Sequence, residues 1–212
     1  MRMFHIIYAA VCIILANMPY KPRAMKERIE KSPAFAVFVA EWLFLFVILF
    51  YLPSQAFLIV NYSFLPVFVA TSLVWFASPW FVRAFGKRPA KIEGDISKTF
   101  LMDFKPHAFV AKYFEILCQQ GLFVYILFVI LRGLSLPLQL FWFLLFVVLV
   151  HLANLLFMEK KYAMMFTYWS IPMAIVFGWL ILNGYILATI SIHMLFYVVL
   201  NGRYWFTKAK II

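Results

Sequence analysis

The sequence has little of what a soluble protein needs. Only 13% of its 212 residues are charged, and 8 Asp and Glu stand against 19 Lys and Arg. Hydrophobic residues make up 67% of the chain and its mean hydropathy is +0.95, whereas a soluble domain is about 45 to 50% apolar. This composition excludes a soluble globular domain and indicates a chain whose apolar surface meets a lipid bilayer.

Cysteine is scarce, and recognisable metal motifs are absent from the sequence. Cys12 and Cys118 are the only two cysteines and each lies inside an apolar run, so neither a disulfide framework nor a paired metal site follows. Two histidines and a glutamate can ligate a catalytic zinc, but no HExxH motif supports one here. We therefore expect no metal and no cofactor.

The excess of positive charge does not indicate nucleic-acid binding. The net charge of +11 comes from Lys and Arg in short segments between apolar runs, where membrane topology explains it. We expect membrane lipids as partners and no nucleic acid. Internal repeats, low-complexity tracts and Pro-rich linkers are also missing, so residues 1–212 are predicted to form a single integral membrane domain.

Apolar segments near the ~20 residues that a helix needs to cross the hydrocarbon recur along the chain. They predict an all-α, polytopic transmembrane bundle of about seven spans, with spans one to three peripheral and spans four to seven forming the catalytic core. Basic residues follow spans one, three, five and seven, which puts the N-terminus outside and the C-terminus in the cytoplasm. The expected membrane is the bacterial inner membrane. The predicted spans are 3–19, 33–52, 62–85, 108–131, 137–158, 163–182 and 184–205.

Two connections have features of their own. Residues 53–64 are predicted to include an interfacial or re-entrant piece on the outer side. The longest cytoplasmic connection, 86–107, mixes both charge signs and is partly amphipathic, so we expect it to lie along the membrane surface.

Ionisable side chains inside spans are costly, at roughly 2.5 to 3.5 kcal/mol each on insertion scales, so each needs a partner or a task. Glu41, Glu115, His151 and His193 lie in spans two, four, five and seven. At a rise of ~1.5 Å per residue, the last three reach similar depths in the cytoplasmic half. We expect them to share one cavity with Gln119, one turn from Glu115, and with Glu41 as a further candidate.

A carboxylate and two imidazoles in a low-dielectric pocket could form a hydrolytic set. Glu115 would take a proton from water, and a histidine would stabilise the developing charge. Asn154, Asn201 or Gln119 could donate to an oxyanion.

The order and spacing of these residues resemble the three motifs of the CPBP family, the prenyl-protein protease and bacteriocin-processing type of intramembrane protease. The matching residues are Glu115 in FEILCQQ, His151 in FVVLVHLAN and His193 in SIHMLFYVVLN, within spans four to seven. The resemblance implies metal-free cleavage of a membrane-embedded peptide or protein. Glu115 and His151 would activate water, and His193 would form the oxyanion site with the polar residue at Tyr197.

The sequence also departs from the family pattern. The glutamate is single, between Phe114 and Ile116, although the family has a Glu-Glu pair followed by Arg. Gln119 or Gln120 stands where that Arg is expected, Phe146 is one residue out of register before His151, and Tyr197 replaces Asn. The resemblance therefore implies either an active peptidase or a catalytically silent relative.

Structural roles remain open beside the catalytic ones. Glu115 could pair with Lys112, three residues earlier on the same helix, and each histidine could hydrogen-bond a neighbouring helix. The alternative function is a non-enzymatic membrane subunit or small transporter component, whose buried polar residues fix helix packing or pass protons. A lipid-modifying enzyme using the same cavity is a third possibility.

Overall fold

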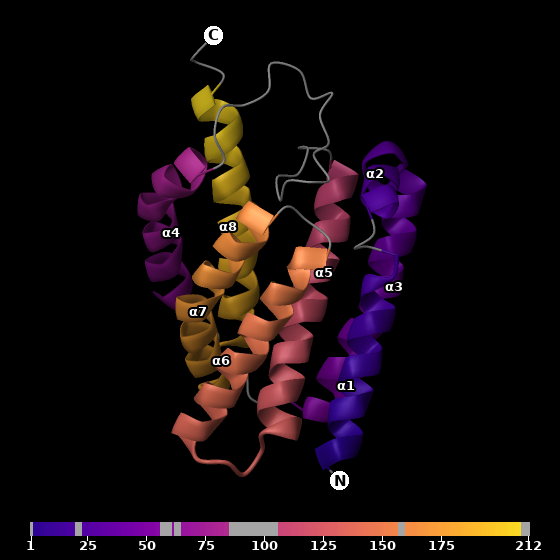
Figure 1. Ribbon diagram of the computed structural model, residues 1–212, viewed down its shortest axis with the longest axis vertical. Coiled ribbons are helices and arrows are strands. Elements are labelled where there is room, and N and C mark those ends of the chain that lie inside the picture. Colours follow the sequence, from indigo (N-terminus) through magenta and orange to yellow (C-terminus); the bar gives the residue numbers. More distant parts are fainter. Residues whose placement is uncertain are drawn as a thin grey trace.

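The computed structural model of the chain describes residues 2–19, 23–55, 61, 65–84, 106–156 and 160–208. Within these ranges every regular element is a helix and there is no strand, so the predicted all-α fold is confirmed. The longer helices lie side by side as a bundle (Figure 1). They are α1 (Arg2–Asn17), α2 (Arg23–Lys31), α3 (Pro33–Ser54), α4 (Leu65–Ala84), α5 (Pro106–Tyr125) with a π-helical turn (Ile126–Ile130), α6 (Leu136–Leu152) with a 3-10 turn (Ala153–Leu156), α7 (Lys160–Leu182) and α8 (Ile186–Lys208).

Several of these helices have the length and composition of membrane spans. In the described part of the chain, four stretches are long and apolar enough to cross a membrane: Pro33–Ser54, His107–Ile130, Leu136–Leu156 and Ala163–Leu182. The 22 residues of α3 extend roughly 33 Å, which matches the ~30 Å hydrocarbon core. The chain is therefore an integral membrane protein of the helical type.

Each of the seven predicted apolar segments coincides with one of the long helices α1, α3, α4, α5, α6, α7 and α8. The apolar segments did not predict α2, a short helix in which Ile29 is buried and the Arg28 guanidinium lies 4.5 Å from the centre of the Phe35 ring. The predicted re-entrant piece and the predicted surface segment fall almost entirely outside the described residues.

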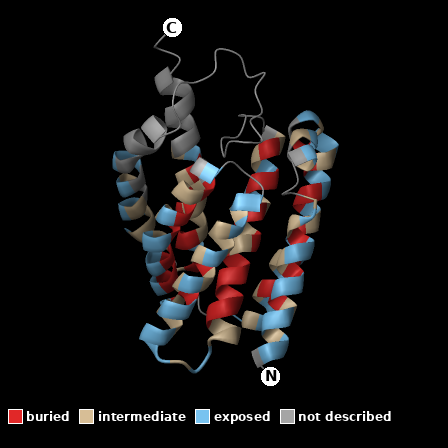
Figure 2. Cartoon of the chain, viewed as in Figure 1, coloured by how far each residue is buried: buried red, intermediate tan, exposed pale blue. Residues whose placement is uncertain are grey.

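The core is built around α5, which packs against α3 on one side and α8 on the other, while α6 packs on α7 and α4 on α8. Figure 2 shows the buried residues along α5 and on the inner faces of its neighbours. On α3 the buried face repeats at helical spacing through Ala36, Val39, Ala40 and Leu43. Small residues at such a face let two backbones approach closely, which is how helices gain contact area in lipid.

Gly121 of α5 marks one close approach between helices. A Cβ atom built there would lie 2.9 Å from the Tyr51 ring and 3.3 Å from Phe50 Cβ. We expect Gly121→Leu to lower the free energy of unfolding by about 1 to 3 kcal/mol, because overpacking forces α3 and α5 apart. Unfolding by dodecyl sulfate, followed by circular dichroism, measures the effect. Ala10→Leu, at an exposed position of α1, should change it by no more than ~0.5 kcal/mol, and equal effects of the two would contradict the packing argument.

Two glycines close the turns at one end of the bundle. Gly133 and Gly184 have φ of 83° and 82°, a left-handed conformation that glycine adopts without steric cost. They link α5 to α6 and α7 to α8, and the turns lie at the same end as the N-terminus (Figure 1). α8 runs from these turns toward the opposite end of the bundle.

Candidate functional site

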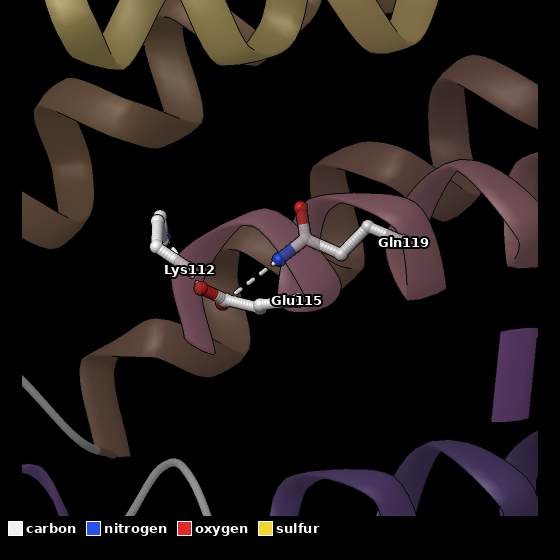
Figure 3. Close-up of polar contacts among 3 residues, drawn as sticks. All are labelled: Lys112, Glu115 and Gln119. Atoms are coloured by element: carbon white, nitrogen blue, oxygen red, sulfur yellow. Dashed lines mark hydrogen bonds and ion pairs between the residues drawn. The ribbon is translucent and has the colours of Figure 1, made fainter. Parts of the chain in front are cut away.

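The polar residues of α5 form a buried cluster of their own. Lys112 Nζ lies 2.5 Å from Glu115 Oε2, and Gln119 Nε2 donates to Glu115 Oε1 over 3.0 Å (Figure 3). The three residues share one helix face because they are spaced by three and four positions. The Lys112 and Glu115 side chains are only 8% and 5% exposed. The ion pair that the sequence left open as an alternative is thus present, and it is buried.

This cluster is connected to α8 through aromatic contacts. Lys112 Nζ lies 4.0 Å from the centroid of the Tyr197 ring, a cation–π distance. Tyr197 stacks on His193 with the ring centroids 5.5 Å apart and an interplanar angle of 25°. On its other side, His193 Nδ1 lies 3.0 Å from Gln120 Nε2. The contacts therefore run from α5 to α8 and back to α5.

Two cavities adjoin these residues. The smaller has a volume of about 180 Å³ and lies among α4, α6, α7 and α8, with one wall from α5. The larger has a volume of about 450 Å³ and lies among α1, α3, α5 and the end of α6. The sequence predicted one chamber. In the structure, the residues predicted to line it are divided between these two cavities.

The predicted residues separate accordingly. His151, His193 and Tyr197 line the smaller cavity. Glu115, Gln119 and Asn154 line the larger cavity.

The two remaining predicted supporting residues are Glu41 and Asn201. Glu41 is exposed on α3 and lines neither cavity, because the buried face of that helix is formed by Ala40 and Leu43 instead. Asn201 is in α8, but its side chain lies outside the described residues.

The two histidines of the smaller cavity are held in complementary tautomers. His151 Nδ1 lies 2.8 Å from Val147 O, and a carbonyl oxygen only accepts, so the proton is on Nδ1 and Nε2 is the acceptor. Gln120 Nε2 donates to His193 Nδ1, so the His193 proton is on Nε2. One ring therefore carries an acceptor at Nε2 and the other carries a donor at Nε2.

Most of the smaller cavity is apolar. Phe123 and Phe177 contribute to its wall, and the Phe177 ring centroid lies 5.8 Å from that of His193. Ser170 also lines the cavity, but its hydroxyl donates to Thr167 O over 2.8 Å. An apolar wall with a few polar groups is the usual form of a binding site for an organic ligand.

Gln120 and Ser170 were not among the residues predicted for the site. Gln120 is fully buried, and its Oε1 has no hydrogen-bond partner among the residues that the structure describes. One signal was available for Gln120: it follows Gln119 directly, and successive residues of a helix point about 100° apart. Two adjacent glutamines must therefore face different neighbours. For Ser170, which follows Thr167 and Tyr168 in a largely apolar run, the sequence carried no such signal.

The described residues contain no group of three His, Cys, Asp or Glu side chains that could hold a metal ion. The zinc alternative thus finds no ligand set in that part of the chain. Comparisons of the chain with protein-family models, with curated proteins and with solved structures found no match.

Proposed function

We propose that this protein is a membrane-embedded hydrolase that cleaves a peptide bond, either an intramembrane peptidase of the CPBP type or a descendant of one. The observation that carries the proposal is the pair of histidines in one apolar cavity, with a proton acceptor on His151 and a proton donor on His193. Acyl transfer to water needs both groups, since one must remove a proton from water and the other must stabilise the oxyanion.

The reaction would proceed as a general-base hydrolysis. His151 Nε2 accepts a proton while the water oxygen forms a bond to the peptide carbonyl carbon, and His193 Nε2–H donates to the carbonyl oxygen as it becomes negative. The carbon–nitrogen bond then breaks, and the proton on His151 passes to the leaving amine. The hydrogen bond from His151 Nδ1 to Val147 O fixes the ring and turns Nε2 away from its own helix backbone.

Glu115 has a different role in this proposal from the one expected from the sequence, where it was the base. It lines the other cavity and already accepts hydrogen bonds from Lys112 and Gln119. Here it is a positioning residue: it holds Lys112, which lies over Tyr197, which in turn stacks on His193.

The size of the smaller cavity limits what enters it. Its volume of about 180 Å³ is below the ~300 to 1,000 Å³ of pockets that enclose a drug-sized ligand. Its wall is mainly aromatic and aliphatic. The substrate would therefore insert one apolar side chain and the bond beside it, as a hydrophobic peptide segment could.

The proposal is tested with the purified protein in lipid nanodiscs. A panel of internally quenched peptides, each with a hydrophobic segment, is added, and fluorescence and mass spectrometry report cleavage. We expect a peptide to be cut next to a large apolar residue in the presence of a chelator. If no peptide is cut by the wild-type protein, the hydrolase proposal is lost.

We also propose the finer topology: seven spans, an external N-terminus and a cytoplasmic C-terminus in the bacterial inner membrane. It is supported by the seven long helices and by the gathering of Lys and Arg in alternate connections. Alkaline phosphatase fused after Leu134 should be active, and a fluorescent protein fused at the C-terminus should fold and emit. The reverse pattern would contradict this orientation.

A second candidate function has its own support. Each carboxylate oxygen of Glu115 is already hydrogen-bonded within α5, as expected if the cluster fixes the packing of a non-enzymatic subunit or small transporter component. The contacts from Glu115 through Lys112 and Tyr197 to His193 would then secure α8 against α5, or form part of a proton path between the two cavities. Variants of the Lys112–Glu115 ion pair and of His151 and His193 distinguish the two candidate functions.

A further inference from the structure

The larger cavity has the dimensions of a ligand site and plays no part in the hydrolysis proposed above. Its volume of about 450 Å³ falls within the ~300 to 1,000 Å³ typical of small-molecule pockets. Leu43, Phe50 and Leu122 form part of an apolar wall. Such a wall accommodates a hydrocarbon chain.

Exposed apolar side chains line one side of this cavity. Three of its lining residues, Ile14, Met18 and Leu156, are 65%, 60% and 80% exposed. They lie at the end of α1 and in the 3-10 turn after α6. Because exposed apolar side chains of a membrane protein contact lipid, a molecule would enter sideways from the bilayer.

The polar groups that line the cavity are the amides of Asn17, Gln119 and Asn154 and the carboxylate of Glu115. Asn17 directs its amide nitrogen to Ile13 O over 2.7 Å, and Gln119 directs its own to Glu115 Oε1 over 3.0 Å. Each of these amides has its carbonyl oxygen as an acceptor and a second N–H as a donor. The carboxylate of Glu115 is also an acceptor, and its charge is balanced by Lys112.

We propose that the larger cavity binds a neutral, single-chain amphiphile whose head group donates hydrogen bonds, such as a long-chain alcohol or a monoacylglycerol. A hydroxyl head both donates and accepts, so it matches amides that do the same. An ammonium head would add an unpaired charge to a site that is already neutral, and burying such a charge is costly. A carboxylate or phosphate head would bring a second negative charge beside the Glu115 carboxylate. This inference stands on the cavity alone and does not depend on the peptidase proposal.

The test uses the full chain in phosphatidylcholine nanodiscs, because the phosphatidylcholine head group has no hydrogen-bond donor. A long-chain alcohol that carries a photoreactive diazirine is crosslinked, and mass spectrometry locates the adducts. We expect adducts on lining residues such as Cys118 and Leu122. Tetradecanol should compete at about one tenth of the concentration of tetradecyl methyl ether, the difference expected for one or two hydrogen bonds. Tetradecylamine and tetradecanoate should compete less well than the alcohol.

Variants identify the groups that recognise the head. Asn17→Leu and Gln119→Leu should each remove most of the preference for alcohol over ether. Asn183→Leu is the matched control, because Asn183 makes the same bond to the carbonyl four residues earlier, Trp179 O, over 2.8 Å, and lines neither cavity.

The comparison of alcohol with ether uses the wild-type protein. The proposal can therefore be tested even if a variant fails to fold. Equal competition by the two compounds would overturn it. So would adducts spread over the outer helix faces with none in the cavity.

Discussion

Lys112→Met is expected to lower the free energy of unfolding by about 3 to 5 kcal/mol, because it leaves Glu115 as an uncompensated buried charge. The Glu115 side chain is 5% exposed and its Oε2 lies 2.5 Å from Lys112 Nζ. Glu115→Leu should lower the free energy of unfolding by a similar amount, since it removes the counter-ion of the buried Lys112 ammonium group. Dodecyl sulfate titration of the purified protein, followed by circular dichroism, measures both variants.

The double substitution Lys112→Met with Glu115→Leu should be far milder than either single one. Replacing both partners of a buried pair by apolar residues of similar volume is often neutral or stabilising. Lys160→Met, at an exposed position of α7, serves as the control and should stay within ~0.5 kcal/mol of the wild-type protein. Single variants as stable as this control would show that the pair has no role in the fold.

His151→Gln is expected to lower peptide hydrolysis by about 10² to 10⁴-fold, the usual contribution of a general base. Glutamine approximates the size of the imidazole but does not accept a proton. His193→Leu should cost about 10² to 10³-fold, as loss of an oxyanion donor does. His193→Gln should retain part of the activity, because its amide N–H can still donate. Single-turnover hydrolysis of the cleaved peptide measures all three.

The matched control for these variants is His5→Gln. His5 is bonded to Tyr125 Oη at 2.7 Å and lines neither cavity, so its loss should leave hydrolysis near the wild-type rate. Unfolding is measured beside activity for every variant. Variants of His151 and His193 that lose stability in proportion to activity would favour the non-enzymatic candidate.

The double variant of the ion pair also decides the role of Glu115. If Glu115 positions Lys112 and Tyr197, hydrolysis by a stable double variant should fall only modestly, to about a tenth of the wild-type rate, because such a residue orients a reacting group without touching the substrate. If Glu115 is the base expected from the sequence, the fall should be about 10² to 10⁴-fold. The same protein preparation thus distinguishes the two mechanisms.

The positions of the long helices were predictable because they follow from a local rule. In lipid each backbone N–H and C=O must be satisfied within its own segment, so an apolar run of sufficient length becomes a helix whatever its neighbours are. The ends also carry local signals. The Ser32 hydroxyl caps α3 by accepting from Phe35 N, and Gly133 closes the turn before α6. The short helix α2 has no apolar run and was missed.

The candidate site was only partly predictable. The depth of Glu115, His151 and His193 follows from the constant rise of a helix, and the ion pair of Glu115 with Lys112 follows from their spacing of three residues. The rotation of each helix about its axis is set by packing against its neighbours, which one sequence does not reveal. Because of these rotations, Glu115 lines one cavity and the two histidines line the other. Glu41 faces outward for the same reason.

The sequence by itself determined an all-helical membrane bundle and the residues that could carry chemistry within it, because burial in lipid and helix geometry act locally. Only the tertiary structure decided which of those residues meet. Gln120 reaches His193 while its neighbour Gln119 reaches Glu115, since a step of one residue turns the side chain by about 100° toward a different helix. That choice of neighbour is a property of the packed bundle.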